Sequence, residues 1–206
     1  MAQFFSIHPE NPQQRLVDQA VEVLRRGGLI VYPTDSAYAL GCQVGDKMAL
    51  DRIRALRQLD KHHNFTLMCR DLSELATYAR VTNADFRLLK AHTPGPYTFI
   101  LNATSEVPRR LMHPKRRTIG MRVPNNPIAL ALMERLGEPL MTSSLILPGD
   151  LLPLTDPYEI RDVLEHQVEL VIDGGFCGLE PTTVVDLTEE VPRVTRVGCG
   201  PVDEFQ

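Results

Sequence analysis

Two patterns of apolar residues alternate along the 206-residue chain, one with the period of a helix and one with short continuous runs. The segment 13–26 predicts a helix because its apolar positions recur at roughly helical spacing: Leu16, Val17, Ala20, Val21, Val23 and Leu24. Gly27 and Gly28 then supply a stop common after helices. The run LIVY at 29–32 is short, apolar and partly β-branched, which predicts a strand covered on both faces.

The alternation continues through the rest of the chain. Asp46 is expected to cap a helix over 46–58, and further helices are predicted over 71–79, 84–92, 126–137 and 158–165. The strand-like segments are 65–69, 97–101, 118–123, 139–144, 168–173, 182–187 and 193–197. Since no low-complexity linker or internal repeat interrupts this order, we predict a single mixed α/β domain over 1–206.

The composition fits a globular protein, with 43% hydrophobic and 23% charged residues. No stretch approaches the roughly 20 apolar residues of a membrane span, and the first residues lack the pattern of a signal peptide, so we expect a cytoplasmic protein without a membrane partner. The cysteines stand singly, which predicts neither a disulfide framework nor a zinc site. We expect reduced, mostly buried thiols at Cys42, Cys69, Cys177 and Cys199.

One basic segment departs from the net charge of −4. Between residues 107 and 122 no acidic side chain accompanies the cations Arg109, Arg110, Lys115, Arg116, Arg117 and Arg122. The segment is a candidate anion-binding surface, and a solvated connecting loop is an equally good interpretation of a charge run in isolation.

Small hydroxyl residues lie at strand ends beside turn formers in three places: VYPTDS at 31–36, PLMTSSLILPG at 139–149 and DGGFCGLEPTTVVD at 173–186. Any one of them could cap a helix or form a turn. In open α/β sheets, however, ligands commonly bind beyond strand ends, where hydroxyls and backbone N–H groups can hold an anion. Three such clusters together favour a phosphate or carboxylate site.

Other chemical signatures are absent. The sequence has no Walker phosphate loop, no G-x-G-x-x-G, no H-E-x-x-H and no nucleophile elbow. His62 and His63 are adjacent and lack a third suitably spaced ligand, so we predict no metal site and expect solvent-exposed loop histidines.

The chain resembles the YrdC-like family of threonylcarbamoyl-adenylate synthases. The ordered segments that carry the resemblance are VYPTDSAYALGC, TPGPYTFIL, TIGMRVPNNPIA, PLMTSSLILPG and VIDGGFCGLEPTTVVDLT, which extend over nearly the whole chain. The resemblance implies a twisted mixed parallel and antiparallel sheet, flanked by helices, around a basic concave groove. It also implies chemistry in which ATP, with Mg²⁺ and no tightly bound cofactor, reacts with L-threonine and bicarbonate to give threonylcarbamoyl-AMP, a precursor of modified adenosine in tRNA.

The resemblance also implies roles for individual residues. Thr34 and Arg122 would bind the amino-acid substrate, and Arg57 and Ser144 would take part in catalysis. Lys61 is a further catalytic candidate because it is near Arg57 in the sequence, not because of the resemblance. The nucleotide would lie among Ser143, Ser144, Thr182, Thr183 and Arg196.

Two motifs depart from those of the synthases. A Lys-x-Arg pair followed by Pro is replaced by Arg57-Gln58-Leu59-Asp60, and a Ser-x-Asn pair by Ser144-Leu145-Ile146. The arginine fork does not simply replace a compact ammonium, and each lost charge-stabilising group commonly costs about 10²–10³ in rate. Lys61 is a candidate replacement cation.

Two functions therefore follow. In the first, the protein acts on ATP or an acyl-adenylate, as a weak synthase or in the hydrolytic direction. In the second, the same basic groove serves as a non-catalytic module that binds double-stranded RNA or tRNA. In the alternative, the contacts to phosphate come from Arg109, Arg110, Lys115, Arg116 and Arg117.

Overall fold

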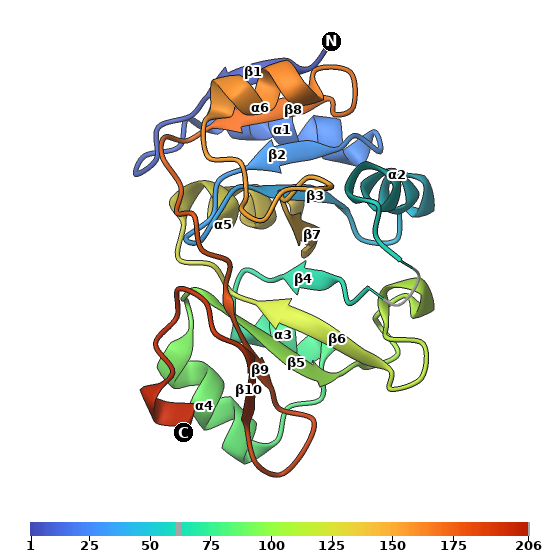
Figure 1. The fold of residues 1–206 in the computed structure, drawn as a ribbon, viewed down its shortest axis with the longest axis vertical. Helices are drawn as coiled ribbons and strands as arrows, with labels where there is room; N and C mark the ends of the chain where they lie inside the picture. The colour runs from blue at the N-terminus through green and yellow to red at the C-terminus, as the bar shows by residue number, and fades with distance from the viewer. Residues whose placement is uncertain (61–62, 206) are drawn as a thin grey trace.

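One twisted sheet runs the length of the molecule (Figure 1). The computed structural model describes residues 1–60 and 63–205. Within them the sheet has ten strands in the order β1-β8-β2-β3-β7-β4-β6-β5-β9-β10. Their bounds are β1 Gln3–Ser6, β2 Ile30–Tyr32, β3 Ala39–Gln43, β4 Thr66–Met68, β5 Tyr97–Asn102, β6 Thr118–Arg122, β7 Leu140–Ser144, β8 Leu170–Asp173, β9 Thr183–Asp186 and β10 Arg193–Arg196.

Parallel and antiparallel pairs mix along this sheet, which confirms the predicted fold class. The parallel pairs are β1–β8, β2–β8, β4–β6 and β5–β9, and the others are antiparallel. The β4–β7 pair joins an upper half, with β1, β8, β2, β3 and β7, to a lower half, with β4, β6, β5, β9 and β10. Its register matches Thr66 with Thr142 and Met68 with Leu140.

The helices are α1 Gln14–Arg25, α2 Lys47–Arg57, α3 Leu72–Tyr78, α4 Asn83–His92, α5 Pro127–Leu136 and α6 Pro157–Leu164, with short 3₁₀ turns at η1 Arg109–Leu111 and η2 Asp203–Phe205. The Asp46 carboxylate accepts the Ala49 N–H, as predicted for the cap of α2. Asn126 caps α5 in the same way, and Gly137 ends it with a positive φ. None of the helices in the described ranges is long and apolar enough to cross a bilayer.

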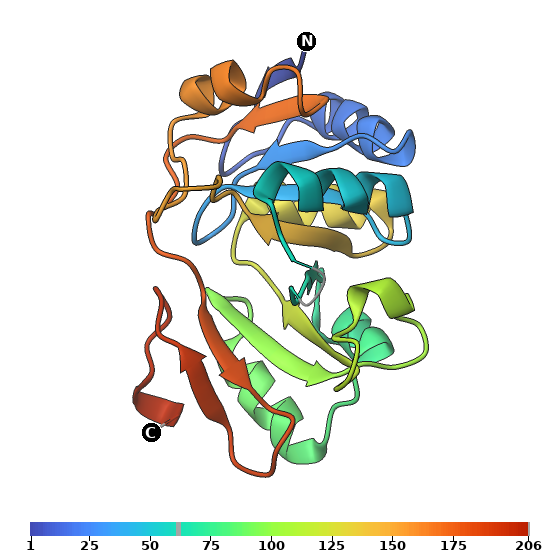
Figure 2. The ribbon, with the colours of Figure 1, turned by 45° about the vertical axis from the view of Figure 1, so that its right-hand side comes forward.

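Helices cover both faces of the upper half. The helices α1 and α5 pack with Ile30 and Tyr32 of β2, whereas α2 and α6 lie on the other face with Leu29 and Val31 (Figure 2). The strand predicted to be covered on both sides is therefore confirmed in β2, whose residues are all buried.

The lower half has helices on one face. In β5, Phe99 and Leu101 belong to the buried core that includes Leu75 of α3 and Leu89 of α4, and Ile119 and Met121 of β6 join them. Because side chains alternate along a strand, Thr98 and Ile100 of β5 and Gly120 and Arg122 of β6 face the other way. They line a cavity.

The segment 39–43 forms a strand that the sequence analysis missed. Its residues, ALGCQ, include few strongly strand-forming types, which explains the absence of a signal. Gly41 is required there because an added Cβ would lie 2.8 Å from the Tyr32 ring of the paired strand β2. The edge strand β1 was missed too, since four residues with two exposed give little pattern.

The core of the lower half predicts a large loss of stability on truncation of Phe99. Its side chain is fully buried, so Phe99→Ala should lower the free energy of unfolding by about 3–5 kcal/mol, measured by urea denaturation. Phe86→Ala is the matched control, because that ring on α4 is 45% exposed and its removal should cost far less. Equal losses would contradict the assignment of the core to the α3–α4 face.

Candidate functional site

A cavity of about 330 Å³ lies on the face of the lower half that no described helix covers, and it extends to the upper half. Strands from both halves line it, with β3 and β7 above and β4, β5, β6, β9 and β10 below. The polar lining consists of Arg57, His63, Asn64, Thr66, Thr98, Arg122, Thr142, Ser143, Ser144, Thr182, Thr195 and Arg196. The cavity thus collects cationic and hydroxyl side chains from five strands, from Thr182 just before β9, and from the end of α2.

Arg57, the last residue of α2, lines the cavity, and its hydrogen-bond partners there are uncharged. Its Nε donates to the Ile146 carbonyl at 3.0 Å, and one terminal nitrogen donates to the Ser143 hydroxyl at 2.5 Å. No ion pair joins Arg57 to a carboxylate in the described part of the chain. Burial, and then the charge of Arg196, lower the pKa of the Arg57 guanidinium. The group remains a cation at neutral pH.

Arg196 on β10 has the same kind of surroundings. It donates to the Thr182 carbonyl through Nε at 3.0 Å and through a terminal nitrogen at 2.8 Å, and to the Thr182 hydroxyl at 3.0 Å. Within the described ranges it also has no carboxylate partner. Burial lowers its pKa most; Cys199 raises it and Arg122 lowers it.

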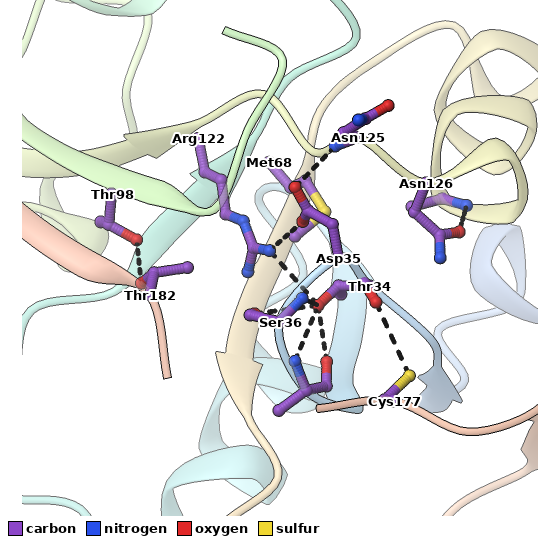
Figure 3. A network of polar contacts seen from close by, with 12 residues as sticks. Thr34, Asp35, Ser36, Met68, Thr98, Arg122, Asn125, Asn126, Cys177 and Thr182 are labelled. Atoms are coloured by element: carbon purple, nitrogen blue, oxygen red, sulfur yellow. Dashed lines mark hydrogen bonds and ion pairs between the residues drawn. The ribbon is translucent and has the colours of Figure 1, made fainter. Parts of the chain in front are cut away.

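Arg122, the last residue of β6, forms an ion pair with a carboxylate (Figure 3). It donates to the Asp35 carboxylate, whose other oxygen accepts the Asn125 N–H at 2.8 Å. Both side chains of the ion pair are nearly buried, at 6% and 10% exposure. The pair joins a lower-half strand to the loop after β2 in the upper half.

The predicted substrate residue Thr34 lies behind this pair. Its hydroxyl donates to the Ala37 carbonyl, accepts the N–H groups of Ser36 and Ala37, and lies 3.3 Å from a terminal nitrogen of Arg122. Thr34 is buried and is not among the lining residues. Cys177 donates to its carbonyl, since burial raises the pKa of that thiol to about 11. The Thr34 hydroxyl therefore shapes the loop that presents Asp35.

The other predicted hydroxyls divide into two groups. Ser143, Ser144 and Thr182 line the cavity, and the Thr182 hydroxyl also bonds that of Thr98 at 2.7 Å (Figure 3). Thr183 instead points away from the cavity, donating to the Gly200 carbonyl and accepting the Gly198 N–H. It fixes the C-terminal loop rather than lining the site.

Leu59 and Ile146, which stand where the synthase motifs have other residues, lie in different parts of the structure. Leu59 packs against the hydrophobic core, whereas Ile146 forms an apolar part of the cavity wall. Lys61, the candidate replacement cation, lies outside the described residues.

His63 corrects an expectation from the sequence. It is half-buried and lines the cavity, with its ring 5.2 Å from the Phe65 ring in an edge-on arrangement. This position could not be predicted, because a histidine in a loop has no periodic pattern that places its side chain. Asn64 and Thr195 also line the cavity without having been predicted.

The basic loop lies away from the cavity. Five exposed cations precede β6: Arg109, Arg110, Lys115, Arg116 and Arg117. Arg122 ends that strand, which is about 13 Å long from its first to its last residue at the usual rise per residue. Arg110 donates to the Gly45 carbonyl, and Arg116 lies 3.8 Å from the Asp186 carboxylate. Arg122 is therefore close to these cations in the sequence but separate from them in the structure, because it lines the cavity and they do not.

Comparison with known proteins identifies the family. A family model named Sua5_yciO_yrdC, with the description telomere recombination, matches residues 22–198.

The chain belongs to this family.

Its relatives include both uncharacterised and catalytic members. The protein YciO of Escherichia coli is 63% identical over all of both chains, and its crystal structure superposes with a TM-score of 0.97. A threonylcarbamoyl-AMP synthase of Chromobacterium violaceum is 35% identical over 190 residues, covering 91% of this chain and 96% of its own. A crystal structure of P. abyssi Sua5 complexed with L-threonine has a TM-score of 0.89 at 27% identity, covering 98% of this chain and 59% of that one.

The ion pair between Asp35 and Arg122 predicts that the stability lost on removing Asp35 depends on whether Arg122 is still present. Asp35→Ala should lower the free energy of unfolding by about 3–5 kcal/mol, because a nearly buried cation loses its partner. The double variant Asp35→Ala with Arg122→Met should lose less than the single one, since no uncompensated charge remains. Urea denaturation measures both, and Asp162→Ala in the exposed Arg161 pair serves as a control that should cost about 1 kcal/mol or less. A double variant less stable than the single one would contradict this account.

Proposed function

We propose that the cavity binds an adenine nucleotide or acyl-adenylate and that the protein acts on this class of compound, as a hydrolase of a threonylcarbamoyl-AMP-like substrate rather than as an efficient synthase. One observation carries the proposal: Arg57, Arg122 and Arg196 converge on one cavity, and two of them have only neutral hydrogen-bond partners in the part of the chain that the structure describes. Arg57 is half-buried and Arg196 is more exposed, yet both guanidinium groups are partly desolvated and close to other cations. Like charges held together favour a counter-charge, and phosphate oxygens supply one with forked geometry.

The surrounding groups suit an adenylate. Arginine forks and the hydroxyls of Ser144 and Thr182 can hold a phosphate, while Ile100, Ile146 and Val184 provide an apolar wall for the rest of the ligand. When the anhydride bond of an acyl-adenylate breaks, negative charge grows on the departing phosphate. Fixed guanidinium groups stabilise that charge without reorganisation. The family relationship supports the choice of substrate class, since members are threonylcarbamoyl-AMP synthases.

The altered positions favour hydrolysis over synthesis. Synthesis starts from a triphosphate, whose leaving pyrophosphate carries more charge than AMP and requires more cations. In this chain Leu59 packs into the core, and Ile146 lines the cavity where a synthase would present an amide. Magnesium would enter bound to ATP as part of the substrate, because the described residues contain no cluster of three His, Cys, Asp or Glu side chains suited to holding it.

Nucleotide binding is tested by calorimetric titration with AMP. Arg196→Gln should weaken binding about 10–100-fold, the effect of losing a charged hydrogen bond. Arg193→Gln is a matched control on the same strand, because that side chain is 72% exposed and is absent from the cavity lining. Equal affinity in wild type and Arg196→Gln would contradict the assignment of the cavity.

The direction of the reaction is tested by two assays. Purified protein with ATP, Mg²⁺, L-threonine and bicarbonate should release pyrophosphate slowly or not at all, whereas threonylcarbamoyl-AMP should be converted to AMP. Release of pyrophosphate that requires both L-threonine and bicarbonate, at a rate above that of hydrolysis, would identify a synthase instead.

Binding of structured RNA is the second candidate function, and the exposed basic loop favours it. Arg109, Lys115 and Arg117 have no ion-pair partner in the described ranges, so their charge is available to phosphates. The loop lies beyond the opposite end of β6 from Arg122. RNA bound there would leave the cavity open to a nucleotide.

An RNA-binding role predicts an affinity for tRNA that falls steeply with salt, because each contacted phosphate releases counterions. The double variant Arg109→Ala with Lys115→Ala should weaken binding and flatten the salt dependence by about two contacts. Arg15→Ala with Arg26→Ala, on and beside α1 in the upper half, provides a charge-matched control. Affinity that does not change with salt would exclude this role.

A further inference from the structure

His63 places an imidazole in the wall of the cavity. Among the lining residues that the structure describes, it is the one whose side chain ordinarily titrates near neutral pH; the other ionisable ones are Arg57, Arg122 and Arg196. The nearby carboxylate of Asp35 is held by Arg122 and the Asn125 N–H. A reaction in the cavity that needs proton transfer from water therefore has His63 as its available acceptor.

The surroundings of His63 keep the imidazole neutral. Burial lowers its pKa from 6.5 most, Arg57 lowers it next, Asp60 raises it and Arg54 lowers it further. The ring contacts Phe65 edge-on, and its N–H on the backbone donates to the Asp60 carbonyl. Because the pKa lies below its ordinary value, the ring is unprotonated at pH 7 and can accept a proton.

His63 lies near Arg57, whose charge affects its pKa, and both side chains line the cavity. Arg57 reaches the Ser143 hydroxyl and the Ile146 carbonyl, so it lies where an anionic ligand would be held. A base next to such a cation can deprotonate water close to a bound phosphoanhydride, and the cation stabilises the charge that then develops.

We propose that His63 is the general base that activates water for the hydrolysis of an acyl-adenylate bound at Arg57, Arg122 and Arg196. This inference rests on the proposed hydrolytic function. The water oxygen forms a bond to the acyl carbon, the imidazole takes one of its protons, and the bond between that carbon and the phosphate oxygen breaks. AMP leaves with the electron pair of that bond, the acyl group leaves as its acid, and the proton passes from the imidazolium to solvent.

The test measures AMP release from threonylcarbamoyl-AMP between pH 5 and 8. Wild type should show a plateau at neutral pH and a tenfold fall per pH unit below the pKa of His63, which lies under 6.5. His63→Gln should lower the plateau by about 10²–10⁴ and abolish the acidic limb. His63→Ala should regain part of the rate on addition of imidazole, which a structural role would not allow. His166→Gln, an exposed histidine away from the cavity, should match wild type.

Calorimetric AMP binding separates this inference from the function on which it rests. His63→Gln should bind AMP within about threefold of wild type, because the arginines that hold the phosphate remain. Hydrolysis by His63→Gln at the wild-type rate with an unchanged acidic limb would overturn the role of His63 and leave the proposed function intact. Absence of hydrolysis in wild type would overturn both.

Discussion

The ion pair between Arg122 and Asp35 is the constraint on which the site depends. Removing two charges from water is costly, and the pair recovers that cost only with good geometry and further hydrogen bonds. Asp35 obtains them from Asn125, and the loop that carries it is fixed by the Thr34 hydroxyl. The pair ties the last residue of β6 to the loop after β2, so it sets how the two halves of the sheet face each other across the cavity.

The same fold that buries the core leaves the cavity open. Helices cover both faces of the upper half, whereas in the lower half α3 and α4 cover the face of Phe99 and Met121, and the face of Thr98 and Gly120 lines the cavity. Gly120 is required on that face, since an added Cβ would lie 2.7 Å from the Thr66 hydroxyl. Because side chains alternate along β5 and β6, the residues of the hydrophobic core and the residues that line the cavity lie on opposite faces of the same strands.

The elements that could be predicted from the sequence are those with clear apolar periodicity or a recognisable capping residue. The helix over 13–26, the Asp46 cap and the buried strand at 29–32 are confirmed, because each depends on local spacing. The strand at 39–43 and the placement of His63 could not be found, because both are determined by partners distant in sequence: Tyr32 and β7 for the strand, the cavity wall for the histidine. The hydroxyl clusters supply part of the cavity lining, yet only the fold separates Thr182, which lines the cavity, from Thr183, which holds a loop.

The convergence of Arg57, Arg122 and Arg196 also has a consequence for the folding equilibrium. Burial and then the charge of Arg196 disfavour the charged form of Arg57, and burial and Arg122 do the same for Arg196, so an anionic ligand bound there would offset a cost that the unfolded chain does not have. A ligand that binds only the folded state adds about 2.7 kcal/mol of stability at a hundred times its dissociation constant. The stability of the fold would then depend on the concentration of such a ligand.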